Sequence, residues 1–88
     1  MKVLAFDLDD TLITDGRSTD AVPTVNRLFE DPNNFIVIYT ARSYSIFHAT
    51  RALLAKHGIK YHALVMEKIR ADVYIDDKGV TYEEGNPL

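Results

Sequence analysis

The chain has 88 residues, of which 47% are hydrophobic and 26% charged, with a formal net charge of −3 and no cysteine. This length predicts a single domain, residues 1–88, and this balance is typical of a globular protein. The lack of cysteine excludes disulfides and thiolate metal sites, and the negative charge argues against broad nucleic-acid binding. No apolar run approaches the roughly 20 residues of a membrane helix and no signal peptide is recognisable, so we expect a cytoplasmic protein with no membrane association.

Strand-like and helix-like segments alternate along the chain. Four β-rich runs stand out, at residues 2–6, 35–39, 61–66 and 72–75. Two segments carry apolar residues on one helical face, at residues 20–30 and 45–57. Asp20 can serve as the N-cap of the first helix, and Gly58 follows the second helix where a left-handed C-cap belongs. Residues 83–88 are expected to form a loose tail.

The order of these elements indicates the fold class. The run at 35–39 is continuously apolar, as expected of a strand buried on both faces of a parallel sheet. Two strand–helix–strand crossovers also imply parallel strands. We therefore predict an α/β fold, a minimal Rossmann-like parallel sheet of about four strands with flanking helices.

Polar side chains follow the end of each predicted strand. The sets are, in chain order, Asp7, Asp9 and Asp10; Thr40 and Arg42; Glu67 and Lys68; and Asp76, Asp77 and Lys78. Because the carboxyl ends of parallel strands meet at one edge of a sheet, where ligands bind, we expect these residues to line one crevice.

The chemistry of this set favours a metal ion and a phosphoryl group. Two carboxylates about 4 Å apart repel by on the order of 4 kcal/mol at an effective dielectric near 20, so clustered acids require a cation. With oxygen ligands alone, Mg²⁺ is the natural choice. A carboxylate beside Mg²⁺ can attack phosphorus and form an aspartyl-phosphate, while a lysine offsets the repulsion between the two anions. A second carboxylate two residues on can transfer the protons.

Four segments carry a resemblance to a known family. DLDDTL at 7–12 matches the pattern D-x-D-x-T-L, and IVIYT at 36–40 is an apolar strand ending in Thr. A lysine follows at Lys68, and VYIDD at 73–77 is an apolar strand ending in paired acids. In order and spacing, over roughly residues 2–82, these segments resemble the four motifs of haloacid dehalogenase (HAD) superfamily phosphatases. The longer strings TAR and YIDDKG are similar to small bacterial and phage phosphatases associated with capsular polysaccharide synthesis.

The resemblance implies a role for each matching residue. Asp7 would be the nucleophile, and Asp9 the general acid and base. Thr40 would bind the phosphoryl group and Lys68 would neutralise charge. For Arg42, which the resemblance does not assign, three roles stay open: contact with phosphate or substrate, a surface position, or an ion pair with one of the acids. The Mg²⁺ ligands would be Asp7, the backbone carbonyl of Asp9, Asp76 and Asp77.

The chain also departs from the family pattern. The loop at 66–70 reads MEKIR where this branch often has Gly-Lys-Pro, so Lys60 and Lys78 stay open as alternatives to Lys68. Asp10 is expected to serve the turn rather than the chemistry. There is no room between Asp10 and Asp20 for an inserted cap, so we expect no cap domain. A zinc site is excluded, because no metal-ligand spacing joins His48, His57 and His62.

The sequence thus predicts a Mg²⁺-dependent phosphomonoester hydrolase with an open site. Its phosphorylated substrate would be a small molecule, a polysaccharide precursor or a nucleic-acid end. Alternatively, a neighbouring subunit of a homo-oligomer closes the site, because open sheet edges invite association. Two other functions stay open: a phospho-accepting signalling domain, and a regulatory module that binds metal or phosphate without catalysis.

Overall fold

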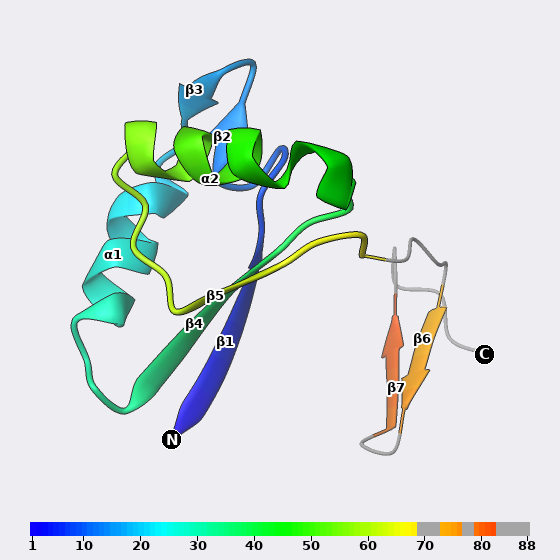
Figure 1. Cartoon of the computed structure of the whole chain (residues 1–88). Helices are drawn as coiled ribbons and strands as arrows, with labels where there is room; N and C mark the ends of the chain where they lie inside the picture. The colour runs from blue at the N-terminus through cyan, green and yellow to red at the C-terminus, as the bar shows by residue number, and fades with distance from the viewer. Residues whose placement is uncertain (69–72, 77–78, 83–88) are drawn as a thin grey trace.

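A computed structural model describes residues 1–68 of the chain and the backbone of two later strands, at 73–76 and 79–82. Its centre is a parallel sheet of three strands, in the order β1 (Lys2–Asp7), β4 (Asn34–Tyr39) and β5 (Ala63–Val65). Asp7 pairs with Tyr39, which in turn pairs with Val65, so the three strands end at the same edge (Figure 1). The α/β class and the parallel sheet are confirmed.

Two helices connect these strands and cover one face of the sheet. Helix α1 (Ala21–Phe29) joins β1 to β4, and α2 (Phe47–Lys56), preceded by the 3-10 turn η1 (Tyr44–Ile46), joins β4 to β5. Both helices lie within two residues of the predicted ranges. Ile36 and Ile38 of β4 are fully buried, in a core that also contains Val25 of α1 and Leu54 of α2. The alternate side chains of the sheet therefore face a single helical layer.

The opposite face of the sheet is apolar, and no described helix covers it. Val3 is 60% exposed and Val65 40% exposed, while Phe35 and Val37 are half-buried. Parallel sheets usually have helices on both faces, and the continuous apolar run at 35–39 predicted that arrangement. Within residues 1–68 the structure covers only one face.

Helix α1 begins at Ala21, directly after the predicted cap Asp20. Asp20 itself has helical angles (φ −65°) and makes no capping hydrogen bond. The side-chain oxygen of Thr19 instead accepts a hydrogen bond from the Ala21 N–H at 3.2 Å. The predicted cap position is confirmed, but the Asp20 side chain does not cap the helix; the hydroxyl of Thr19, also a good capping residue, bonds to the first turn instead.

Helix α2 ends as the sequence predicts. Gly58 has a φ of +65°, the left-handed conformation that glycine adopts without strain. Its N–H donates to the Ala55 carbonyl at 3.1 Å, and the Ile59 N–H donates to the Leu54 carbonyl at 3.0 Å. Ile59 and Leu54 are both part of the buried core, which completes a Schellman motif.

A small hairpin between β1 and α1 was not predicted. Strands β2 (Ile13–Thr14) and β3 (Arg17–Ser18) pair around Asp15 and Gly16, both with positive φ. An Asp-Gly dipeptide at the centre of a two-residue turn is a strong hairpin signal, because both residues tolerate left-handed angles. This dipeptide is the sequence feature that identifies the hairpin.

The fourth predicted strand forms, but it does not join the parallel sheet. Strand β6 (Val73–Asp76) pairs antiparallel with β7 (Gly79–Tyr82), and this hairpin stands apart from the three-stranded sheet (Figure 1). The prediction of about four parallel strands is thus corrected to three among the described residues. Pairing with the next segment closes a very short loop, which costs far less chain entropy than pairing with a distant strand.

Two further predictions concern the C-terminal tail and membrane-spanning helices. The predicted tail, 83–88, lies outside the described residues. Within the described part of the chain, no helix has the length and apolar character needed to cross a membrane.

Candidate functional site

The segment after β1 is a tight turn that directs its acids outward. Leu8 and Leu12 are fully buried, and the Leu8 carbonyl accepts the N–H groups of Leu12 at 2.9 Å and Ile13 at 3.1 Å. Asp10 has a φ of +65°, and its N–H donates to the Ile13 carbonyl at 2.8 Å. Aspartate is one of the few residues that adopts this angle readily, so Asp10 contributes to the turn through its backbone. The anchored leucines leave Asp7 and Asp9 at the sheet edge.

Asp7 lies beside Lys68 at this edge. One carboxylate oxygen of Asp7 accepts the Leu8 N–H at 2.9 Å, and the other lies 3.9 Å from the Lys68 ammonium. The ammonium also sits 5.0 Å from the centre of the Tyr39 ring, a cation–π distance. Because Tyr39 pairs with Asp7 across β1 and β4, the lysine spans the ends of both strands.

Asp9 forms a two-pronged ion pair with Arg42. The guanidinium donates from Nε to one carboxylate oxygen at 3.0 Å and from Nη2 to the other at 2.7 Å. These hydrogen bonds raise the pKa of Arg42 above its ordinary value, so the arginine stays charged. The Asp9 side chain is 44% exposed, and pairs this open to water contribute no more than about 1 kcal/mol to stability. The pair therefore matters more for the orientation of Asp9 than for folding.

Thr40 connects the loops that follow β4 and β5. It is fully buried, and its hydroxyl oxygen accepts the Arg42 N–H at 3.2 Å. Its backbone N–H donates to the Val65 carbonyl, and its carbonyl accepts the Lys68 N–H, both at 2.9 Å. Thr40 thus lies at the predicted position and holds Lys68 near the crevice, while its contact with a phosphoryl group stays a prediction.

Glu67 has a structural role that the sequence did not reveal. It has a φ of +59°, and its N–H donates to the Arg42 carbonyl at 2.9 Å. Its carboxylate accepts the Tyr44 N–H at 3.0 Å and lies 3.5 Å from the Ser43 hydroxyl. These contacts attach the loop that carries Lys68 to the start of η1. The left-handed angle is unusual for glutamate and costs conformational energy, which the contacts of the turn offset.

The structure does not bring every predicted residue to the crevice. Lys60 forms an ion pair with Glu30, and it precedes β5, at the opposite edge of the sheet. The backbone of Asp76 closes the pairing of β6 with β7, and its side chain is not described; Asp77 and Lys78 lie outside the described residues. Within residues 1–68 no group of three or more acids or histidines converges as a metal site would require.

The crevice is the set of described residues Asp7, Asp9, Thr40, Arg42 and Lys68. It offers two carboxylates, each next to a cation, at the carboxyl ends of neighbouring parallel strands. Comparison of the chain with protein-family models finds none that matches, and searches of curated proteins and of solved structures also find no match.

Proposed function

We propose that this protein is a Mg²⁺-dependent phosphomonoester hydrolase of the HAD type, which acts through an aspartyl-phosphate on Asp7. The observation that supports it most directly is the 3.9 Å approach of Lys68 to Asp7 at the end of β1. A carboxylate that attacks a phosphate dianion needs a cation close to the bond that forms, and Lys68 is in that position.

Four of the five residues of the crevice have a part in this reaction. Asp7 attacks phosphorus, the ester P–O bond breaks, and the leaving oxygen takes a proton from Asp9, which has to be protonated on one oxygen when the substrate is bound. Asp9 then takes a proton from the water that hydrolyses the aspartyl-phosphate, so Asp7 and free phosphate are released. Lys68 offsets the negative charge of the phosphoryl group throughout. Arg42 holds the Asp9 carboxylate through hydrogen bonds to both oxygens, and one of these bonds has to open before Asp9 carries the proton.

The donor atoms at the end of β1 fit a magnesium ion in part. Mg²⁺ in proteins commonly takes one or two carboxylates and fills its other positions with water and phosphate oxygens. The Asp7 carboxylate and the Asp9 carbonyl would be such ligands, with Asp76 and Asp77 completing the set directly or through water. When bound, the ion would stabilise charge on the transferring phosphoryl group.

Completion of this set requires β6 to become the fourth parallel strand. β1 has a free edge, because its only described strand neighbour is β4. Lys68 lies beside Asp7, and five Cα–Cα steps from Lys68 to Val73 reach up to ~18 Å. With Asp76 level with Asp7, Val73 would lie level with Leu4, about 10 Å back along β1 and within that reach. The connection would be extended, because it is shorter than a parallel crossover with a helix.

The test is phosphate release from an activated aryl phosphate, with and without Mg²⁺. We expect Mg²⁺-dependent turnover, at least 1,000-fold lower in Asp7→Asn, because the amide is no nucleophile. Asp20→Asn is the matched control, since Asp20 is exposed and makes no capping hydrogen bond. Full activity in Asp7→Asn would contradict the mechanism. Binding of Mg²⁺ without turnover of any phosphoester would favour the regulatory module instead.

The open crevice also bears on the substrate. With side chains of Asp7 and Asp9 each 44% exposed, a bulky phosphoester has access to the site without movement of a lid. A panel of polysaccharide precursors, nucleic-acid ends and small phosphometabolites would identify the class, and the highest kcat/KM decides among them.

A further inference from the structure

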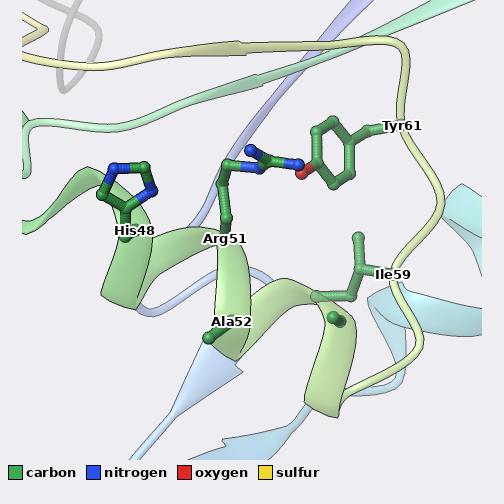
Figure 2. A pocket seen from close by; sticks show the side chains of 6 residues that line it. His48, Arg51, Ala52, Ile59 and Tyr61 are labelled. Atoms are coloured by element: carbon green, nitrogen blue, oxygen red, sulfur yellow. The ribbon is translucent and has the colours of Figure 1, made fainter.

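An open surface pocket, called the cavity below, has a volume of about 410 Å³ and lies between α2 and the segment that leads into β5. Six residues line it: His48, Arg51, Ala52, Ala55, Ile59 and Tyr61. None of them belongs to the crevice. In Figure 2 the guanidinium of Arg51 and the hydroxyl of Tyr61 point toward each other from the helix and from the incoming segment, with His48 one turn earlier on α2. The volume is in the range of small-molecule sites, roughly 300–1,000 Å³.

The cavity combines an apolar wall with hydrogen-bond donors. Ala52, Ala55 and Ile59 contribute methyl and methylene groups, and Ile59 is only 6% exposed. Arg51 offers several N–H donors in a fixed fork, and the Tyr61 hydroxyl and an imidazole N–H add others. No lining residue is acidic. Such a set favours an oxyanion over a cation.

Arg51 is available to a ligand. Among the described residues no carboxylate pairs with it, and its guanidinium lies 5.8 Å from the centre of the Phe47 ring. By contrast, Arg42, Lys60 and Lys68 each form an ion pair with an acid. An arginine on a helix with no carboxylate partner within residues 1–68 is well suited to bind phosphate oxygens in pairs.

The charge of the surrounding chain supports the same conclusion. Residues 32–66 contain no acid but include Arg42, Arg51, Lys56 and Lys60, a formal charge of +4. Because the whole chain carries −3, the remaining residues carry −7. A positive segment in an otherwise acidic protein raises the local concentration of anions, and α2 lies at its centre.

We propose that the cavity is a second binding site, which takes the phosphate group of a small phosphorylated ligand of about mononucleotide size. Arg51 would bind two phosphate oxygens, and Tyr61 and His48 would donate to others. The apolar wall would contact the body of the ligand, since the cavity is larger than a phosphate alone. The site does not depend on catalysis at Asp7.

The test is an NMR titration of the full-length ¹⁵N-labelled chain, in EDTA, with inorganic phosphate, adenosine monophosphate and adenosine as probes. We expect saturable shifts of the amides at 48–55 and 59–61 with both phosphate-containing probes, tighter with the mononucleotide, and none with adenosine. Arg51→Gln should weaken binding at least tenfold. Lys56→Gln removes the same charge from the same helix outside the cavity, and should change binding less than twofold.

Other results would overturn the proposal in distinguishable ways. Equal weakening by Arg51→Gln and Lys56→Gln would show general attraction to a basic helix rather than a site. Shifts confined to residues 7–12 and 40–42 would show that phosphate binds only in the crevice, which would leave the proposed hydrolase intact. Tyr61→Phe keeps the ring and removes only the hydroxyl, so unchanged binding in this variant would remove Tyr61 from the site.

Discussion

The two acids at the end of β1 are held in different ways, and the difference suits different roles. Asp9 is fixed by two short hydrogen bonds from Arg42, whereas Asp7 faces Lys68 at 3.9 Å, longer than a hydrogen bond. A nucleophile has to move toward phosphorus, while a group that transfers protons has to keep its direction. The looser contact of Asp7 suits a nucleophile, whereas Asp9 keeps its direction but has to release one Arg42 hydrogen bond before it carries a proton.

Substitution of Lys68 tests the role of the cation. Lys68→Met keeps much of the side-chain length but removes the charge that faces Asp7, so we predict a fall in kcat/KM of at least 100-fold. Lys60→Met is the matched control, because Lys60 pairs with Glu30 at the other edge of the sheet. It should retain activity within threefold and lose no more than about 1 kcal/mol of stability. Steady-state kinetics and thermal melts measure both.

The opposite results would identify another lysine. If Lys68→Met retained full activity and Lys78→Met lost it, the charge on the phosphoryl group would be neutralised from the end of the chain. The contact of Lys68 with Tyr39 and Asp7 would then be structural.

At the scale of elements, local signals in the sequence predicted the structure well. The helix ranges followed from apolar stripes and from Gly58, whose left-handed angle ends α2. The site edge followed from the rule that parallel strands end together, which placed Asp7, Thr40 and Lys68 near one another. Side-chain geometry was beyond these signals. The sequence left open an ion pair of Arg42 with one of the acids, which is confirmed, but the choice of Asp9 and the turn at Glu67 depend on distances between segments far apart in sequence.

The pairing of β6 was the least predictable element for a related reason. The sequence identified an apolar strand before Asp76, but an apolar run does not specify its partner. The nearby segment 79–82 competes with β1 as that partner, and pairing with it costs less chain entropy because the loop between them is short. The apolar run at 35–39 similarly predicted burial on both faces, whereas burial depends on what packs there.

Two neighbouring residues of β4 test the single helical layer. Ile38 is fully buried against the helices, and Val37 is half-buried on the other face. Ile38→Ala should lower the free energy of unfolding by about 2–5 kcal/mol, through lost burial and a cavity. Val37→Ala should lower it by less than about 1.5 kcal/mol, because water already reaches the side chain. Urea denaturation measures both, and equal losses would mean that the second face is covered in solution.

At the scale of the whole molecule, the proposed site has two parts, one formed by residues 1–68 and one that depends on the β6–β7 hairpin. The sheet, its two helices and the crevice belong to residues 1–68 and are joined by one core. The acids that would complete the metal site belong to a two-stranded hairpin, and isolated hairpins of this kind are only marginally stable in water. A bound ion that joins Asp7 to Asp76 and Asp77 would therefore stabilise the contact between the two parts.

This linkage predicts how Mg²⁺ changes thermal stability. At 100 times its Kd, an ion that binds only the folded chain adds about 2.7 kcal/mol, a rise in Tm of roughly 10–20 °C for a domain of this size. We expect this rise in the wild type and in the control Asp20→Asn, and a much smaller one when Asp76 and Asp77 are both changed to Asn. Differential scanning calorimetry with and without Mg²⁺ measures it. A full rise in the double variant would exclude the paired acids as ligands. Ion binding would then not favour the pairing of β6 with β1 over its pairing with β7.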